Sequence, residues 1–178
     1  HASNPYCAST PACDGRSVVV WHGSGGLHCY SLAGDALWSK DFGEIRHLWG
    51  YGNSPLIAGD RVILYSGAGA EHFAAAVRIS DGEVLWKTVF PGGETNETPD
   101  GQLTGSWATP VVLTAPAGHR VVCALPTGLA ALDPADGRIV WQSEGLASER
   151  GKLVYASPVV TGDAIVAMGG YRGPMLAV

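Results

Sequence analysis

The sequence has 178 residues, of which 46% are hydrophobic and 15% charged, and its formal net charge is −5 at pH 7. This balance supplies enough apolar side chains for a core and argues against an intrinsically disordered chain. The 11 basic residues are scattered singly, which argues against a nucleic-acid partner, because such a surface needs clustered Lys and Arg. No apolar run reaches the roughly 18 residues of a membrane-spanning helix, so no transmembrane segment is predicted.

The first part of the chain is predicted to form four short strands joined by tight turns. Turn signals recur roughly every eight to ten residues, which is typical of an antiparallel sheet. We therefore expect a first four-stranded unit over about residues 4–43. Its expected strands cover residues 6–13, 17–22, 27–32 and 36–40, with a glycine hairpin at residues 23–26.

The same spacing of strands and turns recurs in the rest of the chain. Further units are expected over about residues 50–92, 105–145 and 153–178. A polar, acidic surface loop is predicted at residues 91–105, and no segment of useful length has helical periodicity. The expected strands cover residues 54–58, 61–66, 72–79, 84–90, 108–113, 119–125, 128–133, 138–142, 154–160, 164–168 and 175–178.

Two sequence marks repeat with these units. One is the stretch Ala131-Leu-Asp-Pro-Ala-Asp-Gly-Arg-Ile-Val-Trp141, which has degenerate copies ending at Trp86 and Trp38. The other is a hydroxyl residue before proline, found at Thr10-Pro11, Ser54-Pro55, Thr109-Pro110 and Ser157-Pro158. The spacing from proline to tryptophan is 27, 31 and 31 residues in the first three units, and a fourth tryptophan would fall beyond Val178.

Units of four strands that repeat every forty to fifty residues are typical of β-propeller blades. We expect an all-β chain that forms a single partial β-propeller domain over residues 1–178, with about three and a half four-stranded antiparallel blades. Because the array would stop inside its fourth unit and begins at His1, we expect a processed chain or a piece of a longer one. Unpaired blade edges would then favour self-association.

The repeat A-x-D-x-x-x-G-x-x-x-W, preceded by S/T-P and a Gly-Asp turn, resembles that of the pyrroloquinoline-quinone (PQQ) type propellers. These include quinoprotein alcohol dehydrogenases and the propeller lipoprotein of the outer-membrane β-barrel assembly machinery. The segments HLWGYGNSP and YASPVVTGDAIVAMGG look most like secreted quinone-binding-like repeat proteins. The repeats depart from the family pattern at Asp136, Arg78 and Ser31.

The resemblance implies a structural role for the tryptophans and an extracytoplasmic location, periplasmic or secreted. Trp38, Trp86 and Trp141 would each dock beside a peptide of the next blade. Family members normally close with seven or eight blades, so this chain resembles part of a ring.

An aromatic residue precedes each S/T-P mark, where the innermost strand of a blade begins. These residues are Tyr6, Tyr51, Trp107 and Tyr155, and Trp49, Arg46 and His47 lie beside Tyr51. Rings that converge on the mouth of a central channel, with Arg and His nearby, could hold a planar anionic ligand. The alternative is that the rings only fill the wedges between blades.

Other chemistry has little support in the sequence. His22, His28 and His72 lack the convergent spacing of a zinc site, so no metal site is predicted. Cys7 and Cys13 could form a bridge, but apolar strand cysteines are the simpler interpretation of all four, with Cys29 and Cys123. No nucleophile motif, phosphate loop or dinucleotide fingerprint is present, so no catalytic residue is predicted.

The preferred hypothesis is a non-catalytic scaffold that binds a protein or an extended ligand and needs no cofactor. The alternative implied by the resemblance is a PQQ- and calcium-dependent dehydrogenase of alcohols or sugars. That reaction would need Glu and Asn ligands to calcium, a catalytic Asp and often adjacent cysteines, and the sequence has no adjacent cysteines. A carbohydrate-binding or hydrolytic propeller is a third possibility, in which the aromatic rings would stack on sugars.

Overall fold

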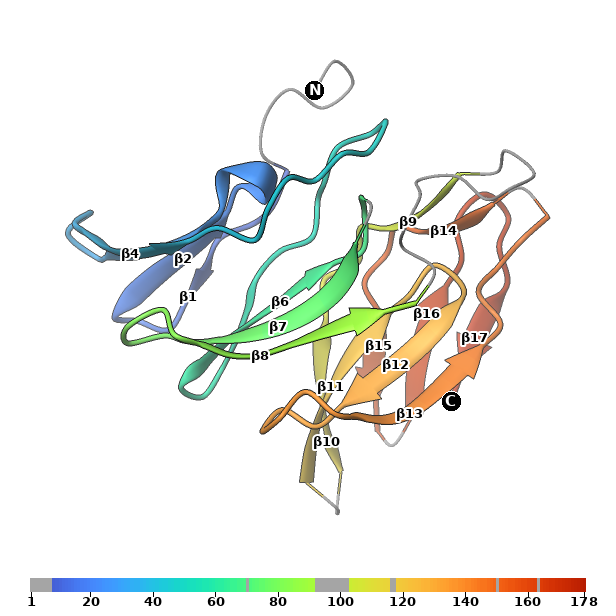
Figure 1. Ribbon diagram of the computed structural model, residues 1–178. Coiled ribbons are helices and arrows are strands. Elements are labelled where there is room, and N and C mark those ends of the chain that lie inside the picture. The colour runs from blue at the N-terminus through green and yellow to red at the C-terminus, as the bar shows by residue number, and fades with distance from the viewer. Residues whose placement is uncertain (1–7, 70, 92–102, 116–117, 150, 163) are drawn as a thin grey trace.

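The structure is a computed structural model that describes residues 8–69, 71–91, 103–115, 118–149, 151–162 and 164–178. Its strands form a row of antiparallel sheets, which confirms the all-β partial propeller (Figure 1). The first sheet contains β1 (Ala12–Cys13), β2 (Ser17–Trp21), β3 (Leu27–Ser31) and β4 (Ala36–Lys40). A 3-10 turn (Gly23–Gly25) joins β2 to β3.

The following sheets have the same sequential order. The second contains β5 (Leu56–Ala58), β6 (Arg61–Ser66), β7 (His72–Arg78) and β8 (Val84–Phe90). The third contains β10 (Val111–Ala115), β11 (Gly118–Ala124), β12 (Gly128–Leu132) and β13 (Ile139–Glu144). The described part of the fourth contains β15 (Val159–Thr161), β16 (Ala164–Met168) and β17 (Met175–Ala177).

Two strand predictions were wrong. The strand expected at residues 6–13 is limited, among the described residues, to β1, because Pro11 lacks an N–H for a sheet ladder. Residues 154–160 were expected to form a single strand, but the chain divides there into β14 (Lys152–Val154) and β15. Pro158 lacks an N–H for a sheet ladder and disfavours a regular strand across this point. β14 instead pairs in parallel with β9 (Thr104–Ser106), a strand that the sequence pattern did not predict.

The hydrophobic core lies between the sheets. One cluster fills the space between the first and second sheets, another lies between the second and third, and another lies between the third and fourth. In β6, Val62 and Leu64 face the first sheet while Ile63 and Tyr65 face the third. The second sheet is therefore covered on both faces, because side chains alternate along a strand. The burial of each large apolar side chain stabilises the folded state by roughly 1.5–3 kcal/mol.

The motif tryptophans lie at the seams between sheets. Trp38 Nε1 donates to Ile79 O at 2.8 Å, and Trp86 Nε1 donates to Pro134 O at 3.0 Å, so each indole reaches the next sheet. Trp141 is partly buried against the core between the third and fourth sheets. The described residues of the fourth sheet end before the turn that would correspond to Ile79 and Pro134.

The hydroxyl residues before proline link successive repeats. Ser54 Oγ accepts from Thr10 N at 2.9 Å, Thr109 Oγ1 accepts from Ser54 N at 3.2 Å, and Ser157 Oγ accepts from Thr109 N at 2.9 Å. These bonds run where first strands of neighbouring sheets meet, since β1 contacts β5 and β10 contacts β15. The S/T-P mark therefore connects the inner ends of the blades.

Candidate binding site

Three of the predicted ligand candidates come together beside the parallel pair β9 and β14. Trp107 follows β9 directly, Tyr155 follows β14 directly, and Trp49 lies on the segment between β4 and β5. These rings and Tyr171, from the loop between β16 and β17, line one hollow of about 290 Å³. We call these four residues the aromatic hollow.

The rings of the aromatic hollow form a closed circuit. Neighbouring ring centroids are 5.7 Å apart for Trp49 and Trp107, 5.6 Å for Trp107 and Tyr155, and 5.8 Å for Tyr155 and Tyr171. Tyr171 and Trp49 close the circuit at 6.4 Å. Such separations are typical of interacting aromatic pairs.

Backbone contacts hold two of these rings in place. Trp107 Nε1 donates to Gly50 O at 3.0 Å, which ties the ring to the chain beside Trp49. Tyr155 lies against Gly170, where an added Cβ would come within 2.5 Å of the tyrosine ring. Gly170 N also donates to Leu153 O at 2.6 Å, so the loop that carries Tyr171 is attached to β14.

Tyr171 was not predicted as a site residue. Its φ is 45° and that of Arg172 is 62°, in the left-handed region that residues other than glycine rarely adopt. Such conformations cost of order 1–3 kcal/mol and persist where the surrounding structure enforces them. The available signal was the glycine-rich segment Gly169-Gly-Tyr-Arg-Gly-Pro174, which places an aromatic residue in a tight loop.

His47 contacts two of the rings that line the hollow, Trp49 and Trp107. It is buried, and its ring lies edge-on to Trp107 at 4.8 Å. Nδ1 accepts from Trp49 N at 3.1 Å, which leaves Nε2 as the donor to Thr104 O at 3.1 Å. Burial lowers the pKa of His47, against the smaller opposing effect of the bond to Thr104. His47 is therefore a neutral residue that positions Trp49 and Trp107.

The remaining predicted candidates lie elsewhere or outside the described residues. Arg46 does not line the hollow and forms an exposed ion pair with Glu44, with Nη2 2.8 Å from Oε2. Tyr51 packs edge-on to Trp21 at 6.3 Å, in the wedge between the first two sheets. Tyr6 lies outside the described residues. The cationic partners expected for an anionic ligand are thus absent from the lining of the hollow.

The exposed side of the hollow is formed by its two tyrosines. Tyr155 is 43% exposed and Tyr171 is 55% exposed. Partial burial and the neighbouring Tyr171 hydroxyl raise the pKa of Tyr155 to about 12. The Tyr155 hydroxyl therefore stays protonated at neutral pH, and the hollow presents aromatic surface to a ligand.

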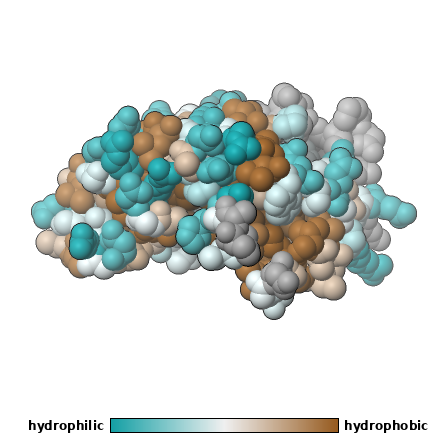
Figure 2. Space-filling model, turned by 90° about the horizontal axis from the view of Figure 1, so that it is seen from below, coloured by the Kyte–Doolittle hydropathy of each residue, from teal (hydrophilic) through white to brown (hydrophobic). Residues whose placement is uncertain are grey.

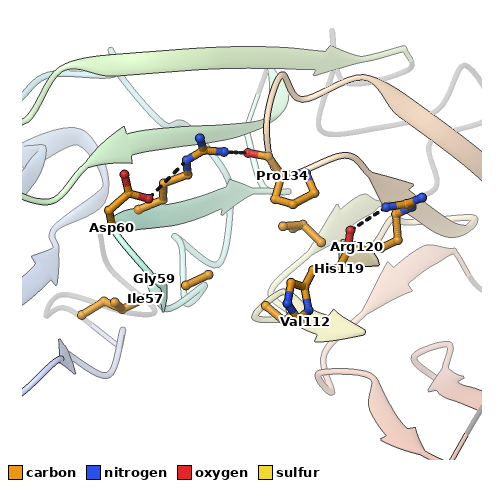
Figure 3. Close-up of a pocket in the computed structure, with 10 residues that line it drawn as sticks. Ile57, Gly59, Asp60, Val112, His119, Arg120 and Pro134 are labelled. Carbon is orange, nitrogen blue, oxygen red and sulfur yellow. Dashed lines mark hydrogen bonds and ion pairs between the residues drawn. The ribbon is translucent and has the colours of Figure 1, made fainter. Parts of the chain in front are cut away.

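A second hollow of about 470 Å³ lies between the second and third sheets (Figure 3). Ile57 and Val112 contribute apolar surface to it. On the face seen in Figure 2, hydrophobic residues lie at several places among hydrophilic ones. Arg61 donates to Pro134 O and lies 3.5 Å from Asp60 Oδ1, while Arg120 donates to His119 O at 2.7 Å. Both guanidinium groups are thus bound by acceptors within the protein. We therefore interpret this hollow as a packing gap between the second and third blades and not as a ligand site.

Metal and thiol chemistry have no assembled site in the described part of the chain. Its His, Cys, Asp and Glu side chains form no group of three or more that could hold a metal ion. Cys13 is exposed, whereas Cys29 and Cys123 are buried in separate clusters, and all three are free thiols. Cys7, the partner considered for Cys13, lies outside the described residues. Burial raises the pKa of Cys29 and Cys123, so both are neutral packing residues. The described residues include no helix long and apolar enough to cross a membrane.

Solved structures show the same fold in longer proteins. BamB from Moraxella catarrhalis aligns with a TM-score of 0.67 and 21% identity over 98% of this chain and 49% of its own. Quinohemoprotein alcohol dehydrogenase from Comamonas testosteroni aligns with a TM-score of 0.55 and 14% identity over 90% of this chain and 32% of its own. The chain thus spans about half the length of the Moraxella protein and a third of the dehydrogenase.

Sequence comparison identifies the family. No curated protein sequence matches the chain. The family model described as outer membrane protein assembly factor BamB matches residues 3–178, nearly the whole sequence. Together with the repeated sheets and the docked tryptophans, this match shows that the chain belongs to the BamB family of PQQ-like repeat β-propellers.

Proposed function

We propose that this protein is a non-catalytic binding and scaffolding module of an extracytoplasmic compartment, and that the aromatic hollow is its recognition site. The observation that carries this proposal is the closed circuit of four rings, two of which remain largely exposed. Aromatic side chains that are held rigidly and left open to solvent are typical of recognition surfaces, since they bury much area for little loss of entropy.

The family supports a role in binding. The matching model is described as an outer membrane protein assembly factor, and assembly requires contacts with other proteins. Under this proposal the stacked sheets act as a rigid frame, and the segments beside β9 and β14 present the recognition site. A rigid frame reduces the entropy lost when a partner binds.

The alternative is a PQQ- and calcium-dependent dehydrogenase, and the likeness to quinohemoprotein alcohol dehydrogenase favours it. The residues present do not fit that cofactor chemistry. A calcium site needs convergent oxygen ligands, and the described residues contain no carboxylate cluster that supplies them. Cys29 and Cys123 lie in separate core clusters and form no adjacent pair. We therefore derive no step through PQQ.

Site-specific crosslinking tests the binding proposal. A photoreactive phenylalanine analogue at position 171 of the protein, secreted to the periplasm of a Gram-negative host, should form a discrete adduct on irradiation. The control places the same group at Val84, which is 41% exposed on β8. Equal adducts at both positions, or none at position 171, would contradict recognition through the aromatic hollow.

A cofactor titration separates the two functions. Tryptophan fluorescence should not respond saturably to micromolar PQQ with calcium if the protein is a binding module. Saturable quenching that is lost on chelation would instead support the dehydrogenase and justify a substrate screen.

A further inference from the structure

We propose that the aromatic hollow binds a methylated ammonium group, such as the trimethylammonium head of choline. This inference rests on the proposed binding function and names the chemistry that the site recognises. It follows from the circuit of rings, their orientation, the charges around them and the way they are held.

The size of the circuit suits a small cation. Neighbouring centroids are 5.6–6.4 Å apart around the four rings. In a flat square of centroids with this spacing, the middle lies about 4 Å from each centroid, inside the roughly 6 Å range of a cation–π interaction. A group at this point would lie within that range of two tryptophan and two tyrosine rings at once.

The orientation of the rings favours a rounded group over a flat one. Interplanar angles around the circuit are 48°, 32°, 84° and 55°. Neighbouring rings are therefore tilted against each other and do not form one flat surface on which a planar ligand could lie. A tetrahedral trimethylammonium group can touch several tilted walls at the same time.

The charges near the hollow favour a cation over an anion. Arg46 is paired with Glu44 and does not line the hollow, and His47 is neutral because its Nδ1 accepts a hydrogen bond. Arg172 and Glu149 line the neighbouring hollow and are not among the residues that line the aromatic hollow. The protein carries a net charge of −5, which also favours the approach of a cation.

Methylation is favoured because the lining offers few hydrogen-bond acceptors. The four lining side chains contribute two phenol hydroxyls and two indole rings, and the indole N–H of Trp107 already donates to Gly50 O. An unmethylated ammonium is strongly hydrated, and its N–H groups would lose water without replacement. A quaternary ammonium has no N–H to satisfy and buries its methyl groups against the rings.

The site is also preorganised. Hydrogen bonds from Trp107 to Gly50, from Trp49 N to His47 and from Gly170 to Leu153 fix three segments before any ligand arrives. The left-handed backbone of Tyr171 closes the circuit despite its conformational cost. Strain that places an exposed ring opposite three others is consistent with a functional role.

The test is a titration of the protein with choline, followed by tryptophan fluorescence and by calorimetry. The comparison ligands are 3,3-dimethylbutan-1-ol, which has the same shape without charge, and ethanolamine, which lacks the methyl groups. Choline should bind saturably, and both comparison ligands should bind at least about tenfold more weakly. Equal binding of the neutral analogue, or no binding of choline, would overturn the inference.

Variants in one loop provide matched controls. Tyr171→Gly removes a ring and relieves the left-handed strain, so the variant should fold well and bind choline about fivefold or more weakly. Arg172→Gly relieves the same kind of strain without removing a ring, and its affinity should be unchanged or slightly higher. Equal losses of affinity in the two variants would contradict the assignment.

A vesicle experiment identifies the source of the group. If a lipid headgroup is the ligand, the protein should bind phosphatidylcholine vesicles and not phosphatidylglycerol vesicles, and Tyr171→Gly should weaken this binding by about fivefold or more. If the protein binds free choline but not the vesicles, the natural ligand is a soluble molecule that carries the methylated ammonium group. A specific crosslink at position 171 together with no choline binding would overturn this inference and leave the proposed binding function in place.

Discussion

The backbone N–H of Thr109 donates to the hydroxyl of Ser157 at 2.9 Å, across 48 residues of sequence. The Thr109 hydroxyl in turn accepts from Ser54 N, and the Ser54 hydroxyl accepts from Thr10 N. Ser54 and Thr109 each donate through the backbone N–H and accept through the hydroxyl, whereas Thr10 only donates and Ser157 only accepts. The line of bonds joins the segments that precede the first strands of four sheets. A methyl group in place of any of these hydroxyls would leave an N–H without its acceptor.

Thr109→Val tests this line of hydrogen bonds. Valine keeps the shape and suits an extended backbone before proline, but Ser54 N would lose its acceptor at a partly buried position. The free energy of unfolding should fall by about 1–2 kcal/mol, as measured by urea denaturation. Thr161→Val, at an exposed position in β15, should change it by less than about 0.5 kcal/mol. Similar effects of the two substitutions would contradict the role of Thr109.

The turn glycines provide a second comparison. Gly137 has a φ of 73°, and an added Cβ would come within 2.5 Å of the Trp86 ring, whereas Gly34 has a φ of 92° and nothing within 4 Å. Gly34→Ala should cost about 1 kcal/mol through backbone strain alone. Gly137→Ala should cost about 2–4 kcal/mol, because Trp86 must also move away from Pro134 O.

Thermal and urea unfolding of the two alanine variants would check this ranking. Gly82→Ala provides a repeat of the test, since its Cβ would lie 2.8 Å from the Trp38 ring. It should behave like Gly137→Ala. A Gly34→Ala variant as unstable as the other two would show that strain alone accounts for the effect.

Stability should depend on pH through His47. Its folded pKa is lowered by burial below the unperturbed value of 6.5, so the unfolded chain binds this proton at a higher pH than the folded protein does. The free energy of unfolding should therefore fall as the pH drops below about 6.5. Urea denaturation at pH 7.5, 6.5 and 5.5 would measure how the free energy of unfolding changes with pH. These pH values lie above the range in which unperturbed carboxylates titrate.

The His47→Gln variant isolates this group. It removes the titrating ring, so the free energy of unfolding should change less between pH 7.5 and 5.5 than it does in the unsubstituted protein. Protonation of His47 would also break its acceptor bond from Trp49 N, and choline binding by the unsubstituted protein should weaken over the same range. An unchanged pH dependence in the variant would assign this dependence to other groups.

The outer face of the fourth sheet should cause self-association. Ile165 and Ala167 face the core, whereas Val159, Met168 and Met175 are 62%, 54% and 68% exposed on the other side. Apolar sheet faces and unpaired edges of this kind promote contacts between copies. The sedimentation coefficient of the 178-residue chain should rise with concentration in analytical ultracentrifugation.

A charged side chain on this face should prevent the self-association. Met168→Lys should give a monomeric profile at concentrations where the unsubstituted chain associates, and Val84→Lys on β8 should not. A sharp monomeric profile of the unsubstituted chain at high concentration, with cooperative melting, would contradict the prediction.

The sequence by itself determined the architecture. The glycine turns, the alternation within strands and the spacing from proline to tryptophan are local signals, and they correctly indicated four-stranded antiparallel sheets in a partial propeller. The family resemblance was also visible in the motif around Trp141, because each repeat must form the same turn and dock the same indole.

Only the tertiary structure decided which aromatic side chains meet. Trp49, Trp107, Tyr155 and Tyr171 are far apart in sequence, and they converge because β9 pairs in parallel with β14 and Gly170 bonds to Leu153. Tyr51 has the same position in its repeat as Trp107 and Tyr155, yet it packs into the wedge between the first two sheets. Arg46, from the same segment as Trp49, pairs with Glu44 instead. Such outcomes depend on long-range contacts between blades, which local periodicity does not encode.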